Sequence, residues 1–181
     1  MLKKILVFCD ASVSSKDEYA IGAFLIINKE QLDGFKTLNQ EEIKDYIVTK
    51  IKYIKIDTHK STLAELETFI YVISKIHSLS NKEITIYTDC QTLSDLHGER
   101  KDKLVARNFR KKDGSPLKHG DLYRNIIHIF NKYKLNITKI KGHKPKHKKN
   151  NVYDIIFSIV DRLSRKKLRS RSFVEAPFYK K

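Results

Sequence analysis

The feature that most constrains this chain is a run of five apolar residues, 5–9, followed directly by the carboxylate of Asp10. Such a run, bounded by turn residues, predicts a strand that is buried on both faces and lies near the middle of a sheet. A carboxylate at the end of a buried strand raises the free energy unless a cation or a hydrogen-bond donor meets it. Asp10 is therefore a candidate ion ligand, although an aspartate in this position is more often an ordinary turn residue.

A second carboxylate follows a second apolar strand in the same way. Residues 83–88 are rich in β-branched side chains, and Asp89 comes directly after them. If a mixed sheet places the two strands side by side, Asp10 and Asp89 could share a cation. Two divalent ions about 4 Å apart, bridged by carboxylates, activate water and stabilise the leaving oxygen of a phosphodiester. Oxygen ligands favour Mg²⁺, or Mn²⁺ in its place, over Zn²⁺.

The order of the remaining elements predicts an α/β fold. Strands are expected at residues 5–9, 19–27, 50–57, 83–88 and 135–140, and helices at 63–77, 121–133 and 152–169. The first two strands are too close in sequence for a crossover helix, so they should pair as an antiparallel hairpin. The later strands alternate with helices, which implies a mixed five-stranded sheet with helices on both faces. Residues 40–48 fit a short helix or a polar excursion, and residues 28–50 suggest no function.

The chain length and the two cysteines fit one domain inside the cell. A chain of 181 residues is long enough for a single domain, which we place at residues 1–170, with an irregular C-terminal tail at 171–181. Cys9 and Cys90 make neither a disulfide framework nor a zinc-ligand spacing. Both are expected to be small buried side chains.

The charge of the chain indicates a partner that carries phosphates. Lysine and arginine number 37 against 21 acidic residues, for a net charge of +16, and residues 132–181 contain 16 basic and 3 acidic side chains. No apolar run approaches the length of a membrane-spanning helix, and the one after Lys4 is too short for a signal peptide. We therefore expect a soluble, cytoplasmic protein that binds nucleic acid and no membrane. Nothing in the sequence indicates an obligate protein partner.

Two glutamates compete for an inward position on the helix at 63–77. Helical phase places Glu65 at the margin of the buried stripe and Glu67 on the polar side. Glu65 is therefore the candidate ligand. The alternative is a capping box, in which Thr62 caps the helix and Glu65 only reaches back to the cap amide.

The last helix also offers two acids. Asp161 stands among lysines and arginines, where an ordinary role would be an ion pair with Arg165 at i+4. Asp154 lies seven residues earlier on the same face. It is the rival of Asp161 for a place at the site.

Five short motifs in this order resemble the type 1 branch of the ribonuclease H family. Together they cover nearly the whole chain, and each alone is weak. The motifs are Asp10-Ala11-Ser12, Ala64-Glu65-Leu66, Thr88-Asp89-Cys90-Gln91, Lys141-Gly142-His143 and Asp161-Arg162-Leu163-Ser164-Arg165.

The resemblance implies five strands, of which the first three are antiparallel, and a magnesium-dependent endonuclease that cuts the RNA strand of an RNA/DNA hybrid. It also implies that two ions are held by four carboxylates, those of Asp10, Glu65, Asp89 and Asp161. His143 would assist proton transfer or product release, a role that suits a histidine near neutral pH, with His147 as its substitute. Side chains that would contact the substrate are Ser12, Ser61, Thr62, Gln91 and Lys144.

The chain departs from the family pattern in three places. Ser61 and Thr62 stand where the family usually has asparagines that contact ribose 2′-hydroxyls, and they reach less far. The spacing from His143 to Asp161 is longer than usual. The chain has no tryptophan, so the aromatic and basic substrate handle of some members is absent, and the basic segment 100–118 is its candidate replacement.

Two function classes follow from these observations. The first is hydrolysis of the RNA strand of a hybrid by a two-metal-ion mechanism, and it accounts for acids in a strongly cationic chain. The second is a catalytically silent nucleic-acid-binding module on the same fold, which gains nothing from four acids. A third possibility is a related nuclease that acts on DNA junctions or double-stranded RNA.

Overall fold

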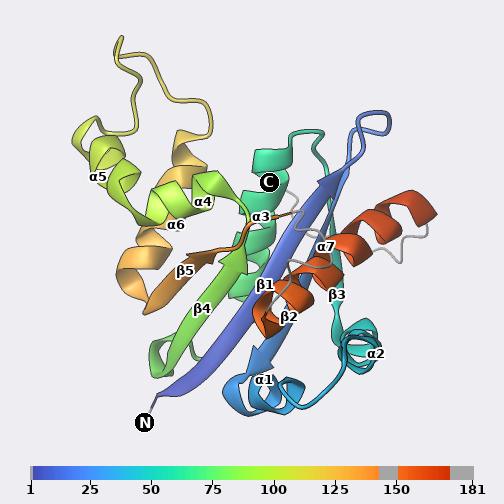
Figure 1. The fold of residues 1–181 in the computed structure, drawn as a ribbon. Coiled ribbons are helices and arrows are strands. Elements are labelled where there is room, and N and C mark those ends of the chain that lie inside the picture. Colours follow the sequence, from blue (N-terminus) through green and yellow to red (C-terminus); the bar gives the residue numbers. More distant parts are fainter. Residues whose placement is uncertain (1, 143–150, 172–181) are drawn as a thin grey trace.

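The computed structural model describes residues 2–142 and 151–171 (Figure 1). Its strands are β1 (Lys3–Val13), β2 (Ala20–Asn28), β3 (Lys52–Ile56), β4 (Lys82–Thr88) and β5 (Leu135–Lys139). Its α-helices are α1 (Lys29–Phe35), α2 (Gln40–Lys50), α3 (Ser61–Ser74), α4 (Gln91–His97), α5 (Glu99–Ala106), α6 (Gly120–Lys132) and α7 (Val152–Ser170). A 3₁₀ turn, η1 (Leu79–Asn81), precedes β4.

The strands form one mixed sheet in the order β3-β2-β1-β4-β5. β1 pairs with β2 and β2 with β3 in antiparallel fashion, whereas β1 pairs with β4 and β4 with β5 in parallel. The predicted α/β class, the five strands and the antiparallel arrangement of the first three are confirmed. β1 lies at the centre of the sheet, as its unbroken apolar run at 5–9 predicts.

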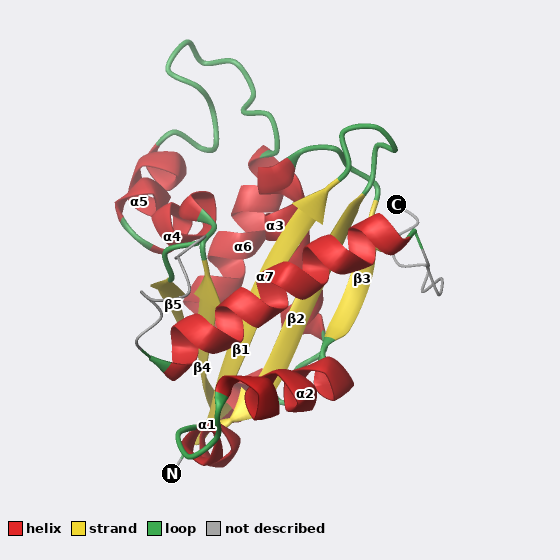
Figure 2. Ribbon diagram, turned by 45° about the vertical axis from the view of Figure 1, so that its right-hand side comes forward, coloured by secondary structure: helices red, strands yellow, loops and turns green. Residues whose placement is uncertain are grey.

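The sheet separates two hydrophobic cores. Alternate residues of β1 face opposite sides, so Ile5, Val7 and Cys9 pack beneath α3, α4 and α6, whereas Leu6 and Phe8 pack beneath α1, α2 and α7. Figure 2 shows α7 lying across the sheet on the second face. Helices on both faces were predicted, and this prediction is confirmed. Asp10 and Ser12 share the parity of Phe8 and therefore point towards α7.

β1 is longer than the sequence predicts, because its two neighbours end at different points. Its parallel pairing with β4 stops at Phe8 opposite Tyr87. Its antiparallel pairing with β2 continues to Val13 opposite Ala20. Asp10 therefore lies within the strand, but beyond the last residue that pairs with β4. One edge of β1 is open at this point, and side chains from other elements can approach Asp10 there.

Residues 28–50 contain two helices, of which only α2 was anticipated. Asn28 and Asn39 each form a capping box with the residue three positions later, Gln31 and Glu42. The buried side chains of this segment belong to the core beneath α7. α1 was missed because seven residues make too few turns for a clear apolar period.

α3 begins two residues earlier than predicted, and Thr62 is not its N-cap. The cap position is Lys60, which makes no side-chain capping hydrogen bond. Thr62 lies inside the first turn, so the capping-box alternative for Glu65 is wrong. Glu65 accepts a hydrogen bond from the Ser61 hydroxyl, at 3.2 Å.

Several smaller predictions also have an outcome. Cys9 and Cys90 are free and buried, as expected. Within residues 2–142 and 151–171, no helix combines the length and apolar character needed to cross a membrane. Most of the expected cationic loop at 141–149 and nearly all of the C-terminal tail lie outside the described residues.

Candidate active site

Asp10 is buried among other carboxylates. It is only 8% exposed, and its Oδ2 accepts a hydrogen bond from Ser164 Oγ on α7 at 2.8 Å. Burial raises the pKa of Asp10 to about 8, and the negative charges of Asp89, Asp161 and Glu65 add to this effect, whereas the Ser164 hydroxyl opposes it. The charges of the three other acids singled out in the sequence therefore all act on Asp10.

Glu65 reaches this cluster because α3 packs very close to β2. A Cβ added at Gly22 would lie 2.2 Å from Thr68 Oγ1 of α3, so only glycine permits the approach. Burial raises the pKa of Glu65 and the charge of Asp89 raises it further, while hydrogen bonds from Cys90 and Ser61 lower it. The close approach suggested by Gly22 in the sequence is present and brings α3 to the site.

Asp89 follows β4 and meets the backbone that follows β5. A Cβ added at Gly142 would lie 2.3 Å from Asp89 Oδ2. The Asp89 carboxylate thus lies directly against Gly142 and fills the place that a side chain at position 142 would take. β4 and β5 end together because they pair in parallel up to Thr88 opposite Lys139.

Of the two acids in α7, Asp161 and not Asp154 is among the charges that act on Asp10. Asp161 is one of the charges that raise the pKa of Asp10, and its carboxylate forms an ion pair with Arg165 one turn later. Asp154 is in the first turn of α7, where Asn151 caps the helix. The two acids are about 10 Å apart along the helix, at 1.5 Å per residue, so one small site does not accommodate both.

The carboxylate cluster fits divalent cations by the chemistry of its donors. The cluster offers only oxygen ligands, which Mg²⁺ and Mn²⁺ prefer, and its accumulated negative charge favours a cation. In the described part of the chain, no three His, Cys, Asp or Glu side chains are already arranged as a metal cage. The carboxylates would therefore adjust their side chains on binding an ion.

The expected substrate-contacting residues lie at different places around the cluster. Ser61 and Thr62 are exposed at the start of α3. Ser12 Oγ lies 2.7 Å from Ser164 Oγ, and the Gln91 side chain contacts Asp95 and Lys139. His143, Lys144 and His147 lie outside the described residues.

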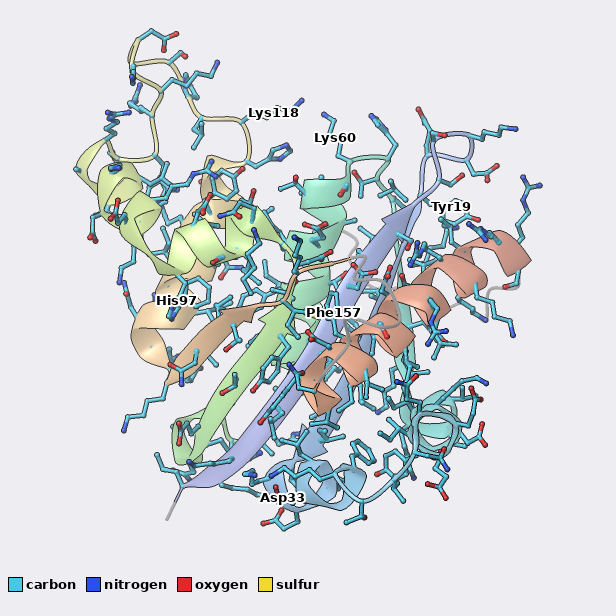
Figure 3. All side chains as sticks on the ribbon, viewed as in Figure 1. Tyr19, Asp33, Lys60, His97, Lys118 and Phe157 are labelled. Carbon is cyan, nitrogen blue, oxygen red and sulfur yellow. The ribbon has the colours of Figure 1, made fainter. Side chains whose placement is uncertain are left out.

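A basic cavity beside these residues was missed in the sequence. It encloses about 370 Å³, and its lining includes Lys60, Ser61, Thr62, His119 and Tyr123. Interaction with Lys118 lowers the pKa of Lys60, so two ammonium groups are held close together, as Figure 3 shows. Burial and both lysines lower the pKa of His119. The sequence carries no sign of this cavity, because Lys60 and His119 are far apart in the chain.

The basic segment 100–118 forms α5 and a loop that projects from the body of the protein (Figure 1). A shallow cavity of about 310 Å³ in it is lined by Arg107, Arg110, Lys111, Lys112 and Gly114. Arg124 of α6 lies over the Phe109 ring, 4.7 Å from its centroid. The projecting segment combines cations and an aromatic side chain, as nucleic-acid-binding surfaces do.

Comparisons with known proteins agree with this architecture. Residues 2–160 match the family model described as RNase H, and no curated protein matches the chain. The solution structure of the PFV RNase H domain superimposes with a TM-score of 0.63 at 15% identity, covering 92% of this chain and 94% of that domain. LC9-RNase H1, described as a type 1 RNase H with the type 2 active-site motif, gives 0.64 at 12% identity, with coverages of 95% and 75%.

A larger protein contains the same fold as one of its parts. The foamy viral protease-reverse transcriptase in complex with an RNA/DNA hybrid gives a TM-score of 0.58 at 13% identity. The match covers 91% of this chain and 20% of that protein. At these identities the structural likeness establishes the fold, and the family assignment comes from the sequence match.

Proposed function

Because this chain belongs to the RNase H family, we propose that it is a metal-dependent endonuclease that hydrolyses the RNA strand of RNA/DNA hybrids. The observation that carries the proposal is that the charges of Glu65, Asp89 and Asp161 all raise the pKa of Asp10. These four carboxylates come from α3, the end of β4, α7 and β1. The chain otherwise carries a net charge of +16. Acids gathered inside a cationic protein would suit a divalent cation, which they would hold and which would offset their charge toward a phosphodiester.

Asp10, Glu65, Asp89 and Asp161 would hold two Mg²⁺ ions, for which Mn²⁺ can substitute. When bound, these ions supply Lewis-acid stabilisation of the negative charge that develops on the reacting phosphodiester. Ser164 holds one oxygen of Asp10 through a hydrogen bond. Ser61 does the same for Glu65.

Proton transfer is assigned to His143, with His147 as the alternative. His143 directly follows Gly142, whose backbone lies against Asp89. A histidine at this point in the chain can take up or release a proton near neutral pH.

The surfaces around the cluster suit a duplex. Ser61 and Thr62 are exposed beside the cluster and can donate hydrogen bonds to ribose hydroxyls. The cavity with Lys60 and His119 offers positive charge for a phosphate, and the projecting segment 107–118 offers more. Gln91 and Ser12 are proposed to contact the hybrid next to the cleaved strand.

The test is cleavage of a labelled RNA/DNA hybrid with and without Mg²⁺, by the parent and by Asp10→Asn. We expect cleavage only by the parent with the ion, leaving a 5′-phosphate on one product. A panel containing single-stranded RNA, double-stranded RNA and a DNA junction identifies the preferred substrate. Hybrid binding without cleavage would favour the silent binding module, and equal cleavage by both proteins would refute the assignment.

A further inference from the structure

Ser164 is a buried hydroxyl at the point where α7 meets β1. The residue is 0% exposed, and three oxygens surround its Oγ. These are Asp10 Oδ2 at 2.8 Å, the Asp161 carbonyl at 2.8 Å and Ser12 Oγ at 2.7 Å. Ser164 and Asp10 are 154 positions apart in the chain.

The chemistry of each group decides which one donates and which one accepts in the hydrogen bonds around Ser164. A serine hydroxyl has one proton and two lone pairs. When Asp10 is ionised, as it would be with a cation bound, its carboxylate and the Asp161 carbonyl only accept, so Ser164 gives its proton to this pair. The Ser12 hydroxyl then donates to Ser164. The carboxylate is the stronger acceptor. The result is a chain of donors from Ser12 to Ser164 to Asp10.

We propose that Ser164 is a positioning residue that fixes the carboxylate of Asp10 relative to Asp161, so that both present oxygens to the same divalent cation. The inference rests on the proposed function, in which these two acids are ligands. Ser164 contacts Asp10 through its side chain and contacts the turn that carries Asp161 through the carbonyl of that residue. A single hydroxyl therefore sets the spacing between the first and the fourth acid.

A neutral donor suits this position better than a cation. Lysine or arginine at position 164 would neutralise Asp10 and compete with a metal ion, whereas a hydroxyl orients one oxygen and leaves the negative charge in place. Hydrogen-bond partners of metal ligands generally change the metal affinity by about 10- to 100-fold when they are removed. The same order of effect is expected here.

The first test is direct Mn²⁺ binding without substrate, followed by the electron paramagnetic resonance signal of the free ion. Ser164→Ala should weaken Mn²⁺ binding about tenfold. The matched control is Ser158→Ala on the same helix, where the hydroxyl donates only to the Ile155 carbonyl, at 2.9 Å. Ser158→Ala should bind Mn²⁺ as the parent does. Equal affinity of a folded Ser164→Ala variant and the parent would overturn the proposal.

The second test is a double-mutant cycle on the thermal midpoint of the metal-free protein. The effect of Ser164→Ala should shrink to about half or less in an Asp10→Ala background, because the partner of the hydroxyl is gone. An equal shift in both backgrounds would mean that Ser164 only stabilises α7, and the proposal would fail.

A third variant keeps the proposal testable if Ser164→Ala does not fold. Ser12→Ala removes only the outer donor of the chain and should weaken Mn²⁺ binding by a smaller factor. Unchanged Mn²⁺ affinity in this variant would then overturn the proposal. If the parent itself binds no Mn²⁺, the proposed function fails. If the parent binds the ion and the serine variants bind it equally well, only the role of Ser164 is refuted.

Discussion

Asp33 in α1 and Asp10 in β1 are the same residue type in opposite surroundings. Asp33 is exposed and lies between two lysines, with Lys29 Nζ at 2.6 Å and Lys36 Nζ at 2.7 Å from Oδ1. These lysines lower its pKa. Asp10 is buried, and burial together with the negative charges of three other acids raises its pKa to about 8. The lysines compensate the charge of Asp33, whereas no cation of the described chain is paired with Asp10 in this way. The surroundings, and not the residue type, therefore distinguish a surface aspartate from a candidate catalytic one.

The largest expected effect is on catalysis. Asp10→Asn should lower kcat/KM for a hybrid by roughly 1000-fold or more, because a divalent cation contributes several kcal/mol to transition-state stabilisation. Asp33→Asn carries the same chemical change on the surface and should leave kcat/KM unchanged. Steady-state cleavage of one labelled hybrid by the three proteins measures the contrast. Similar losses in the two variants would remove the distinction between the two aspartates.

The second effect is on the pH dependence of stability. Because the pKa of Asp10 is raised in the folded protein, the folded state favours its protonated form. In chelator, the free energy of unfolding should therefore fall as pH rises from about 4 to about 8, by a few kcal/mol at roughly 1.4 kcal/mol per pKa unit. Urea unfolding at intervals across this range measures the fall.

Asp10→Asn serves as the control for that measurement. This variant should be more stable than the parent at pH 8 in chelator. Its free energy of unfolding should fall less than that of the parent as the pH rises from about 4 to about 8. Mg²⁺ should stabilise the parent by binding its folded state, and the variant much less. A parent curve that rises over the same range would contradict the raised pKa.

A third prediction compares Gly22, where α3 packs on β2 near the carboxylates, with Gly34 in α1. Gly22→Ala places a Cβ 2.2 Å from Thr68 Oγ1 and 2.8 Å from Ile54 Cγ2, so it should destabilise the protein by about 1–3 kcal/mol and displace Glu65. Gly34→Ala in α1 meets nothing within 4 Å and should stabilise the helix by up to about 1 kcal/mol. Urea unfolding of both variants should give changes of opposite sign.

A fourth prediction concerns Gly142. Gly142→Ala should reduce cleavage about tenfold with little change in thermal midpoint, because a Cβ 2.3 Å from Asp89 Oδ2 displaces one carboxylate. Gly98→Ala is the control, since its nearest contact would be an ordinary 3.6 Å to the Ser94 carbonyl. Full activity in Gly142→Ala would show that the close contact between Gly142 and the Asp89 carboxylate is not needed.

The smallest effect is expected at Asp33. Its pKa is lowered in the folded state, so any stability that it supplies is present at neutral pH and is lost as pH falls through that lowered pKa. Asp33→Asn should therefore differ slightly from the parent at pH 7 and not at all at pH 2. Thermal midpoints at the two pH values measure the difference, and a larger gap at pH 2 would contradict the assignment.

The features that could be predicted from the sequence are those with a long local pattern. The run at 5–9 and the β-branched run at 83–88 were long enough to predict two adjacent buried strands, and the alternation of strands and helices predicted the sheet. α1 and the true start of α3 were not predicted, because seven-residue helices and cap positions leave little periodic signal. The choice of Glu65 over Glu67 came from helical phase alone, and the field around Asp10 includes Glu65.

The sequence by itself determined the order of the elements, the mixed sheet and the presence of acids beside buried strands, because these depend on local periodicity and on where apolar runs end. Only the tertiary structure brought the charge of Asp161 close enough to act on Asp10, placed Ser164 against Asp10 and gathered Lys60 and His119 around one cavity. These contacts join residues that are far apart along the chain. They depend on how closely a helix packs on the sheet, and no local pattern of residues encodes that distance.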